Sequence, residues 1–376
     1  MPANELSEDD SYLGEGLGAT ARLTEEVMAQ IEAKGPISFS NFFNLALYHP
    51  EWGYYARPQQ ARTGKEGDFF TAVSVGTLFG HILAEYARSC WQQAGQPEVF
   101  RIVEWGVEQG DLGRDIMAGA RKTGGDFERA LQYAVVEPLP LKRNALRQRQ
   151  SEWEVVEKSA ELKPLPGLVL GNELLDALSF WLVRWENGQW WEKRVGCVKE
   201  EEATSEGEKF CFEIATPGEA LRERLRLVSG RFCEGYETEI RPSLSLLLAE
   251  MKSVLEGGEV LLFDYGFERD DLYHPSRTTG TLRTYGRHEA GEDPLLNLGQ
   301  IDITAHVDFT ALAEDARMVG LVPDALQSQG HFLTKAAAGL LTQMEGHVDS
   351  HFIRQFQTLT HPGHLGSKFS VFRARV

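Results

Sequence analysis

The chain has 376 residues, and 38 Lys and Arg against 56 Asp and Glu give it a net charge of -18. A charge of this sign repels phosphate backbones and acidic membrane surfaces, so neither nucleic acid nor a membrane is an expected partner. The 4 cysteines lie far apart without a CxxC pair, no apolar run approaches a membrane span, and no basic leader precedes an apolar core. We therefore expect no metal or redox site, and we predict a cytoplasmic protein.

The first 97 residues predict a mobile arm followed by a helical cap. Residues 1–18 are acidic and contain glycine, which is typical of an arm without a core of its own. Residues 19–97 predict three helices, at about 21–34, 39–47 and 77–93; Gly35-Pro36 ends the first, and Ser38 caps the second. No strand alternates with these helices, so the cap is expected to be separate from the sheet that follows.

Residues 98–376 predict an α/β domain. Apolar runs predict strands at 99–104, 132–137, 168–170, 259–264 and 368–375. Amphipathic runs between them predict helices at 111–121, 141–150, 243–256, 308–319 and 332–344, and a short helix from Glu173. This alternation is typical of a Rossmann-like, parallel sheet with helices on both faces.

An insertion at about 180–240 interrupts this alternation. Aromatic and charged residues alternate around Asn187-Gly188, which predicts antiparallel hairpin strands. The sequence does not fix the oligomeric state, and this aromatic insertion is where a homodimer or partner contact would be sought.

Polar residues at the strand ends indicate where a ligand would bind. In an open α/β sheet the ligand lies outside the carboxyl ends of the strands. Glu104 ends the first strand, and the turn from Gly106 to Gly110 leads into a helix start that offers unpaired N–H groups. The other strand ends carry Glu137, Asn172-Glu173 and Asp264-Tyr265-Gly266.

The glycine turn does not match two common nucleotide motifs. A nicotinamide site needs Gly-x-Gly-x-x-Gly with an acid about 20 residues further on, whereas Glu137 follows Gly106 by 31 residues. A phosphate-binding loop would end in Gly-Lys-Ser or Gly-Lys-Thr, which is absent. What remains is the arrangement of an S-adenosylmethionine site, in which the turn receives the amino-acid end of the cofactor and Glu137 the ribose hydroxyls.

Two acids after the third predicted strand suit a cationic methyl acceptor. Glu173 and Asp176, spaced i, i+3 on the predicted short helix, would share one face and orient a planar guanidinium. The alternative is structural: Asn172 would cap that helix, and both acids would complement its positive end. Glu104 and Glu137 have the same alternative, as ordinary strand-end carboxylates.

Seven sequence fragments occur in order between about Gly35 and Val376. They are ALYHPEWGYY (46–55), GDFFT (67–71), VEWG (103–106), NELLDAL (172–178), DYG (264–266), GTLRTY (280–285) and DITAHVDF (302–309). Together they resemble the MidA-like S-adenosylmethionine-dependent methyltransferases, a family that includes the mitochondrial arginine methyltransferase assisting assembly of respiratory complex I. The resemblance implies S-adenosylmethionine as cofactor and an arginine side chain of a protein as substrate.

The resemblance also implies which residues form the site. The glycine turn, Glu137 and the 67–71 loop would surround the cofactor, and the Asn172-Glu173 tip would face the methyl group. The predicted cofactor-binding residues are Gly67, Asp68, Thr71, Glu104, Gly106, Glu108, Gly110 and Glu137. The predicted catalytic residues are Asn172, Glu173 and Asp176. For Asp68, an Asx-turn explains the residue equally well.

Two departures from the family pattern fall in the cofactor loops. The family usually has Gly-Pro-Gly-x-Gly in the turn, where this chain has Glu108 in the middle position, and Ser-Pro-Glu where this chain has residues 72–74. A carboxylate beside the cofactor's own carboxylate costs on the order of 1 to 4 kcal/mol, so weakened cofactor binding is expected. A non-catalytic relative that serves as a binding or assembly module is therefore an alternative.

Two other patterns give weaker alternatives. Ser74, Asp264 and His306 occur in the chain order of a serine hydrolase, with a loose nucleophile elbow around Ser74. His306 and Asp308 would supply only two metal ligands, which make no site, and Asp308 is expected to cap a helix.

Overall fold

The computed structural model describes residues 8–56, 71–198, 209–286, 289–291, 293–343 and 349–376. Its contacts divide the chain into two compact units. The first unit comprises Met1–Gln60, Leu178–Pro242 and Tyr273–Ala305, and the second comprises Ala61–Ala177, Ser243–Leu272 and His306–Val376. The boundaries that we drew at residues 18 and 97 stay a prediction.

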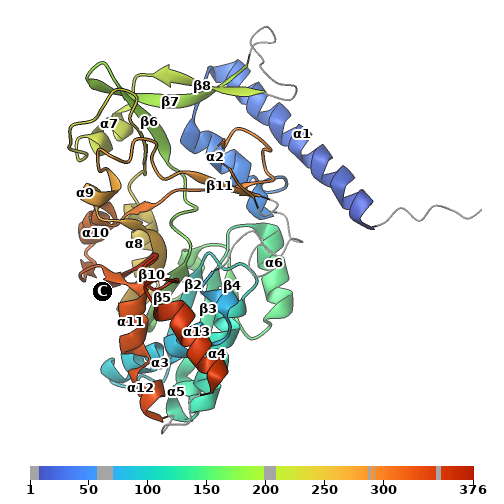
Figure 1. Ribbon diagram of the computed structural model, residues 1–376. Helices are drawn as coiled ribbons and strands as arrows, with labels where there is room; N and C mark the ends of the chain where they lie inside the picture. Colours follow the sequence, from blue (N-terminus) through green and yellow to red (C-terminus); the bar gives the residue numbers. More distant parts are fainter. Residues whose placement is uncertain (1–7, 57–70, 199–208, 287–288, 292, 344–348) are drawn as a thin grey trace, which may run out of the picture. The chain divides into compact units, whose positions relative to one another are not determined.

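A mixed sheet, nine-stranded among the described residues, forms the centre of the second unit, with the order β15-β17-β10-β5-β2-β3-β4 along its main path (Figure 1). The strands are β2 (Phe100–Trp105), β3 (Leu131–Val136), β4 (Glu154–Val156), β5 (Leu165–Asn172), β10 (Leu255–Phe267), β14 (Val307–Asp308), β15 (Val322–Pro323), β16 (Gln327–Ser328) and β17 (Phe369–Arg375). The run from β4 to β10 is parallel, and β17 is antiparallel to β10. The predicted Rossmann-like α/β fold is confirmed.

Helices cover both faces of this sheet, which explains why its strands are continuous apolar runs. They are η2 (Val73–Val75), α3 (Leu78–Gln93), α4 (Asp111–Thr123), α5 (Gly125–Ala130), α6 (Pro140–Arg149), η3 (Ser159–Glu161), α8 (Ser245–Ser253), α9 (Arg269–Leu272), α10 (Phe309–Met318), α11 (Gln329–Ala336), α12 (Ala338–Gln343) and α13 (Ser350–Thr360). Side chains of α3, α4 and α11 share one buried cluster with Ile102, Tyr133 and Leu170 of the strands. Helices α8 and α10 also contact β10.

Three predictions for this unit need correction. No helix follows β5, because residues 173–178 form bends and a turn. The helix expected at 243–256 ends at Ser253, since β10 already begins at Leu255 and passes through a register shift before Glu259. The helix expected at 332–344 is divided into α11 and α12, and Met344 lies outside the described residues.

The first unit contains the antiparallel strands. One sheet has the order β1-β7-β6-β9 with β8 beside β7, and a smaller one has the order β12-β11-β13. The elements are α1 (Glu8–Lys34), β1 (Ile37–Ser38), α2 (Phe39–Tyr48), η1 (Tyr54–Ala56), β6 (Trp181–Glu186), β7 (Gln189–Cys197), β8 (Phe210–Ala215), α7 (Glu219–Leu225), β9 (Glu237–Ile240), β11 (Arg283–Gly286), β12 (Glu289–Gly291) and β13 (Asp302–Thr304).

Local signals explain several of these elements. Ser38 accepts a hydrogen bond from the Asn41 N–H (3.2 Å) and caps α2, as predicted. Asn187 and Gly188 both have positive φ, which matches the twist of the hairpin between β6 and β7 and confirms the predicted antiparallel insertion. Helix α1 begins at Glu8, inside the range predicted as an arm, and residues 1–7 lie outside the described residues.

Candidate functional site

The strand order places the predicted site residues at one edge of the second unit's sheet. From β2 the chain continues to β3 and β4 on one side, and β5 and β10 lie on the other side of β2. All five strands are parallel, so their carboxyl ends share one edge, and the order reverses between β2 and β5. This is the position at which open α/β sheets bind ligands.

The turn after β2 requires glycine at two positions. Gly106 has φ +73, and a Cβ there would stand 2.9 Å from Leu174 Cδ1. Gly110 has φ +83 and is the N-cap of α4, without a side-chain cap bond. The first-turn N–H groups of α4 are therefore not capped by a side chain, which leaves a helix start able to receive an anion.

Glu104 lies inside the sheet, one residue before the end of β2. Its side chain is buried, and the Tyr133 hydroxyl donates to its Oε2 at 2.5 Å. Burial raises the pKa of Glu104 to about 7, opposed by the Tyr133 hydrogen bond and aided by the charge of Asp111. The predicted cofactor role of Glu104 stays a prediction, and its observed contact joins β2 to β3.

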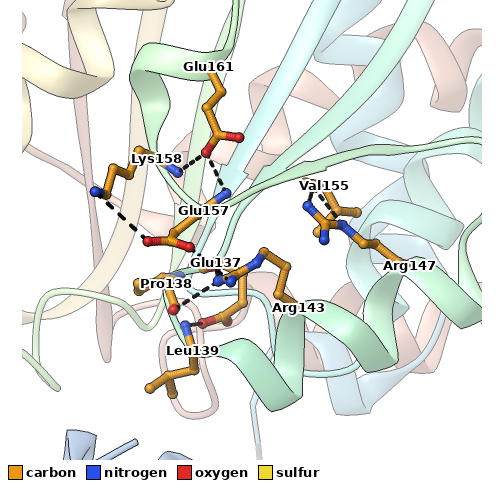
Figure 2. A network of polar contacts seen from close by, with 9 residues as sticks. All are labelled: Glu137, Pro138, Leu139, Arg143, Arg147, Val155, Glu157, Lys158 and Glu161. Carbon is orange, nitrogen blue, oxygen red and sulfur yellow. Dashed lines mark hydrogen bonds and ion pairs between the residues drawn. The ribbon is translucent and has the colours of Figure 1, made fainter.

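Glu137 follows β3 directly and organises the start of α6 (Figure 2). Its Oε1 accepts the Leu139 N–H at 2.8 Å, and its Oε2 lies 3.4 Å from Lys142 Nζ. The Arg143 guanidinium donates to the Glu137 carbonyl at 2.9 Å and pairs with Glu157 at 3.0 Å. A carboxylate has about four acceptor positions, so a fixed Glu137 retains acceptor capacity.

The tip after β5 has a different backbone from the one predicted. Glu173 has φ +51, and its N–H donates to the Phe263 carbonyl at 2.9 Å. A left-handed non-glycine residue costs on the order of 1 kcal/mol, and such strain is retained where the surroundings enforce it. Glu173 and Asp176 therefore do not share a helix face, and Asn172 caps no helix.

Asp264, at the end of the buried part of β10, enforces this backbone. Its Oδ2 accepts the N–H groups of Leu174, Leu175 and Asp176 at 3.1, 2.6 and 3.3 Å, and the side chain is 0% exposed. Its Oδ1 accepts the Tyr265 N–H at 2.9 Å. One side-chain carboxylate therefore accepts three successive backbone N–H groups, and these residues do not form the start of a helix.

The Glu173 carboxylate brings three segments of the second unit together. Asn172 Nδ2 donates to its Oε1 at 3.0 Å, and the Ala72 N–H also donates to the carboxylate. Burial raises the pKa of Glu173 to about 8, and the charges of Asp176 and Glu108 add to the rise. The glycine turn, the segment after residue 70 and the β5 tip therefore meet at a group of three acids.

The Ser74 hydroxyl is used within its own turn. It donates to the Thr71 carbonyl at 2.8 Å and accepts the Thr71 N–H at 3.0 Å, while the Thr71 hydroxyl accepts the Ser74 N–H at 3.2 Å. Asp264 is occupied by backbone donors, and the His306 ring stacks on Tyr265. These contacts are structural and do not build the Ser74 hydrolase. Gly67 and Asp68 lie outside the described residues.

Asp308 has the structural role that the sequence predicted. It is the N-cap of α10, accepts the Ala311 N–H at 2.8 Å and lies 3.4 Å from the Arg269 guanidinium. Within the described ranges, no group of three or more His, Cys, Asp or Glu is placed to hold a metal. Over the same part of the chain, no helix combines the length and apolarity needed to cross a membrane.

Sequence reasoning missed the groups that hold the site acids. Tyr133 beneath Glu104, Lys142 beside Glu137 and the Ala72 N–H at Glu173 were not singled out. Lys142 had a local signal, since it lies in the first turn of the helix that follows the acid. Tyr133 had one too, because it shares a sheet face with Glu104 on the neighbouring strand.

The chain is similar in sequence to known methyltransferases. A family described as S-adenosyl-L-methionine-dependent methyltransferases matches residues 82–326. The mitochondrial protein arginine methyltransferase NDUFAF7 homolog of Drosophila melanogaster is 27% identical, over 98% of this chain and 87% of that protein. The mitochondrial protein arginine methyltransferase NDUFAF7 of Mus musculus is 26% identical, over 78% of this chain and 70% of that protein.

A solved structure is similar along the whole chain. It is a COG1565 superfamily member from Burkholderia thailandensis with S-adenosyl-homocysteine bound, with 27% identity and a TM-score of 0.83, covering 100% of this chain and 95% of that chain. The resemblance to the MidA-like methyltransferases is confirmed.

The predicted cytoplasmic location is contradicted, because the fly, mouse and human relatives are mitochondrial proteins. The charge and hydropathy used for that prediction report on membrane spans and do not determine the compartment.

Proposed function

Because this chain belongs to the family of S-adenosyl-L-methionine-dependent methyltransferases, we propose that it transfers the methyl group to an arginine side chain of a protein. Its cofactor is S-adenosylmethionine, the compound that the family description names. The arginine acceptor is supported by the relatives that are protein arginine methyltransferases and by the acids at the β5 tip.

The residues after β2 and β3 fit this cofactor. The uncapped first turn of α4 offers N–H groups to the carboxylate of its amino-acid part, and the positive φ of Gly106 and Gly110 favours glycine at these two positions of the turn. Glu137 would accept hydrogen bonds from ribose hydroxyls with its remaining acceptor positions. Thr71, at the start of the segment that reaches Glu173 through Ala72, would border the same place.

When bound, S-adenosylmethionine supplies a methyl group already activated on a sulfonium, so the protein has mainly to position the acceptor. Glu173, Asp176 and Glu108 would orient a guanidinium through charge-assisted hydrogen bonds. Asn172 Oδ1 is buried and accepts no hydrogen bond from any residue that the structure describes, so it would take a further guanidinium N–H. In this arrangement Glu108 helps to orient the methyl acceptor, whereas the sequence predicted that Glu108 binds the cofactor.

The placement of the Glu173 carboxylate beside the buried Asn172 amide carries this proposal, and the raised pKa of Glu173 supports it. A pKa of about 8 means that Glu173 holds a proton at neutral pH when the acids stand alone. A guanidinium beside them favours the ionised carboxylate. Glu173 Oε would then accept the proton that the guanidinium nitrogen loses when its new bond to carbon forms.

The experiment is a transfer assay with methyl-labelled S-adenosylmethionine and matched peptides that carry arginine, lysine or glutamine at one position, with mass spectrometry of the products. We expect methylarginine only. Glu157→Gln is the matched control and should methylate the arginine peptide as the wild type does. Glu157 is an exposed acid that pairs with Arg143 and does not belong to the group of Glu173, Asp176 and Glu108. Labelled lysine or glutamine with unlabelled arginine would overturn the acceptor assignment.

A further inference from the structure

A groove of about 350 Å³ lies beside strand β7 in the first unit. The residues that matter in its lining are Trp190, Trp191, Pro217, Arg222, Leu225 and Arg226. They come from the hairpin strand β7, from the segment after β8 and from helix α7 with the residue that ends it. None of these residues belongs to the acid group or the glycine turn.

The groove holds two exposed arginines that have no acid partner among the residues that the structure describes. Arg222 and Arg226 are four residues apart and face the same side of α7 and its end. Within the described ranges neither forms an ion pair, although the chain has 56 acids. Other arginines in the described ranges do form such pairs, as Arg88 does with Glu85 and Arg373 does with Asp324.

The floor of the groove is aromatic and held in place. The Trp190 ring lies 5.1 Å from Trp185 and 4.9 Å from Phe232, centroid to centroid. The Trp191 indole N–H donates to the Glu186 carbonyl at 3.3 Å. Aromatic side chains with few rotatable bonds, next to arginines, are the composition at which binding energy concentrates in protein interfaces.

The geometry points to a binding site for a short acidic segment of a protein partner, in which a carboxylate pairs with Arg222 and Arg226 and an adjacent apolar side chain packs on the tryptophans. Arginine forms bidentate bonds with carboxylates, and the two cations complement an anion in an otherwise acidic chain. The same net charge of -18 opposes a long polyanion such as nucleic acid. The apolar floor argues against a bare inorganic anion.

The test uses the full chain and an array of hexapeptides that combine Asp or Glu with Leu, Ile or Phe. The peptide bound best is then titrated by fluorescence anisotropy. We expect Arg222→Glu and Arg226→Glu each to weaken its binding about tenfold, by loss of a charge-assisted bond and gain of repulsion. Trp191→Ala should weaken it as well, and a peptide with serine at the apolar positions should bind poorly.

Arg231→Glu is the matched control, because Arg231 is exposed, lies outside the groove and makes the same change of charge. Retained binding in this variant supports the site, and an equal loss would show general electrostatic attraction and overturn it. The proposal also fails if no peptide of the array binds, if phosphate binds as tightly as the peptides, or if light scattering shows that the groove joins two copies of this chain.

Discussion

Two loops at the same edge of the sheet each present a glutamate after a parallel strand, but they hold it in different ways. After β3, Glu137 accepts the N–H of Leu139, the residue before α6, and pairs with Lys142 in the first turn of that helix. After β5, Glu173 has a left-handed backbone, and the charges of Asp176 and Glu108 raise its pKa. Its loop is held by Asp264, from another strand.

This difference between the two loops indicates different functions for Glu137 and Glu173. A carboxylate whose partners are already in place is a fixed acceptor, which suits recognition of a neutral hydroxyl group. A carboxylate among other acids, on a strained backbone, is stabilised by an arriving cation. We therefore propose ribose recognition for the β3 tip and guanidinium recognition for the β5 tip.

The largest expected effect tests whether Asp264 holds the β5 tip. Asp264→Ala leaves four N–H groups without their acceptor at a fully buried position, which should lower the free energy of unfolding by about 4 kcal/mol. Urea denaturation measures this loss. Asp264→Asn keeps one acceptor oxygen and should lose less; losses below about 1 kcal/mol in both variants would show that the tip holds itself.

The second expected effect separates catalysis from support at Glu173. Glu173→Gln should lower kcat about 100-fold, within the range for loss of a positioned acid or base, and leave binding of S-adenosyl-homocysteine unchanged. In the wild type, kcat/KM should rise as pH passes about 8, because the ionised form binds and accepts the proton. The variant should lose this rise. Normal turnover per folded molecule would limit Glu173 to a structural role.

These predictions depend on contacts that the sequence shows only in part. The acids at the tips were predictable, because apolar runs that end in Glu104, Glu137 and Asn172-Glu173 are local patterns. The backbone of Glu173 was not, because the acceptor for the following N–H groups lies 88 to 90 residues further along the chain. From the local sequence alone, the capping rules predict a helix that begins at Asn172. In the structure the buried Asp264 carboxylate accepts the N–H groups of these residues, and they form a turn.

The third expected effect concerns Glu104, whose burial raises its pKa to about 7. Because this value lies above the ordinary 4.5, Glu104 binds its proton more tightly in the folded state than in the unfolded state. The resulting stabilisation is complete below pH 4.5 and is lost as pH rises through about 7. Glu104→Gln lacks this titration and should gain about 3 kcal/mol over the wild type between pH 4 and 8.

Chemical denaturation across this pH range measures the gain. The exposed Glu157→Gln is the control and should follow the wild-type curve in this range. Parallel curves for Glu104→Gln and the wild type would mean that Glu104 titrates normally in the folded protein.

The smallest expected effect tests the β3 tip. Glu137→Ala should weaken binding of S-adenosyl-homocysteine about tenfold, or about 1.4 kcal/mol, by loss of the ribose contact. Calorimetry measures it, with Glu157→Ala as the matched control from the same network (Figure 2). Unchanged affinity in Glu137→Ala would limit Glu137 to its hydrogen bond with the Leu139 N–H before α6.

The most direct test of the account is calorimetric titration of the unaltered chain with S-adenosyl-homocysteine. We predict binding in the micromolar range, because the glycine turn and the start of α4 fit the cofactor. The charge of Glu108 interacts with Glu173, so we expect Glu108 not to oppose the carboxylate of the cofactor. A millimolar or absent response that Glu108→Gly restores would contradict the account and identify the chain as a binding or assembly module with a degenerate cofactor turn.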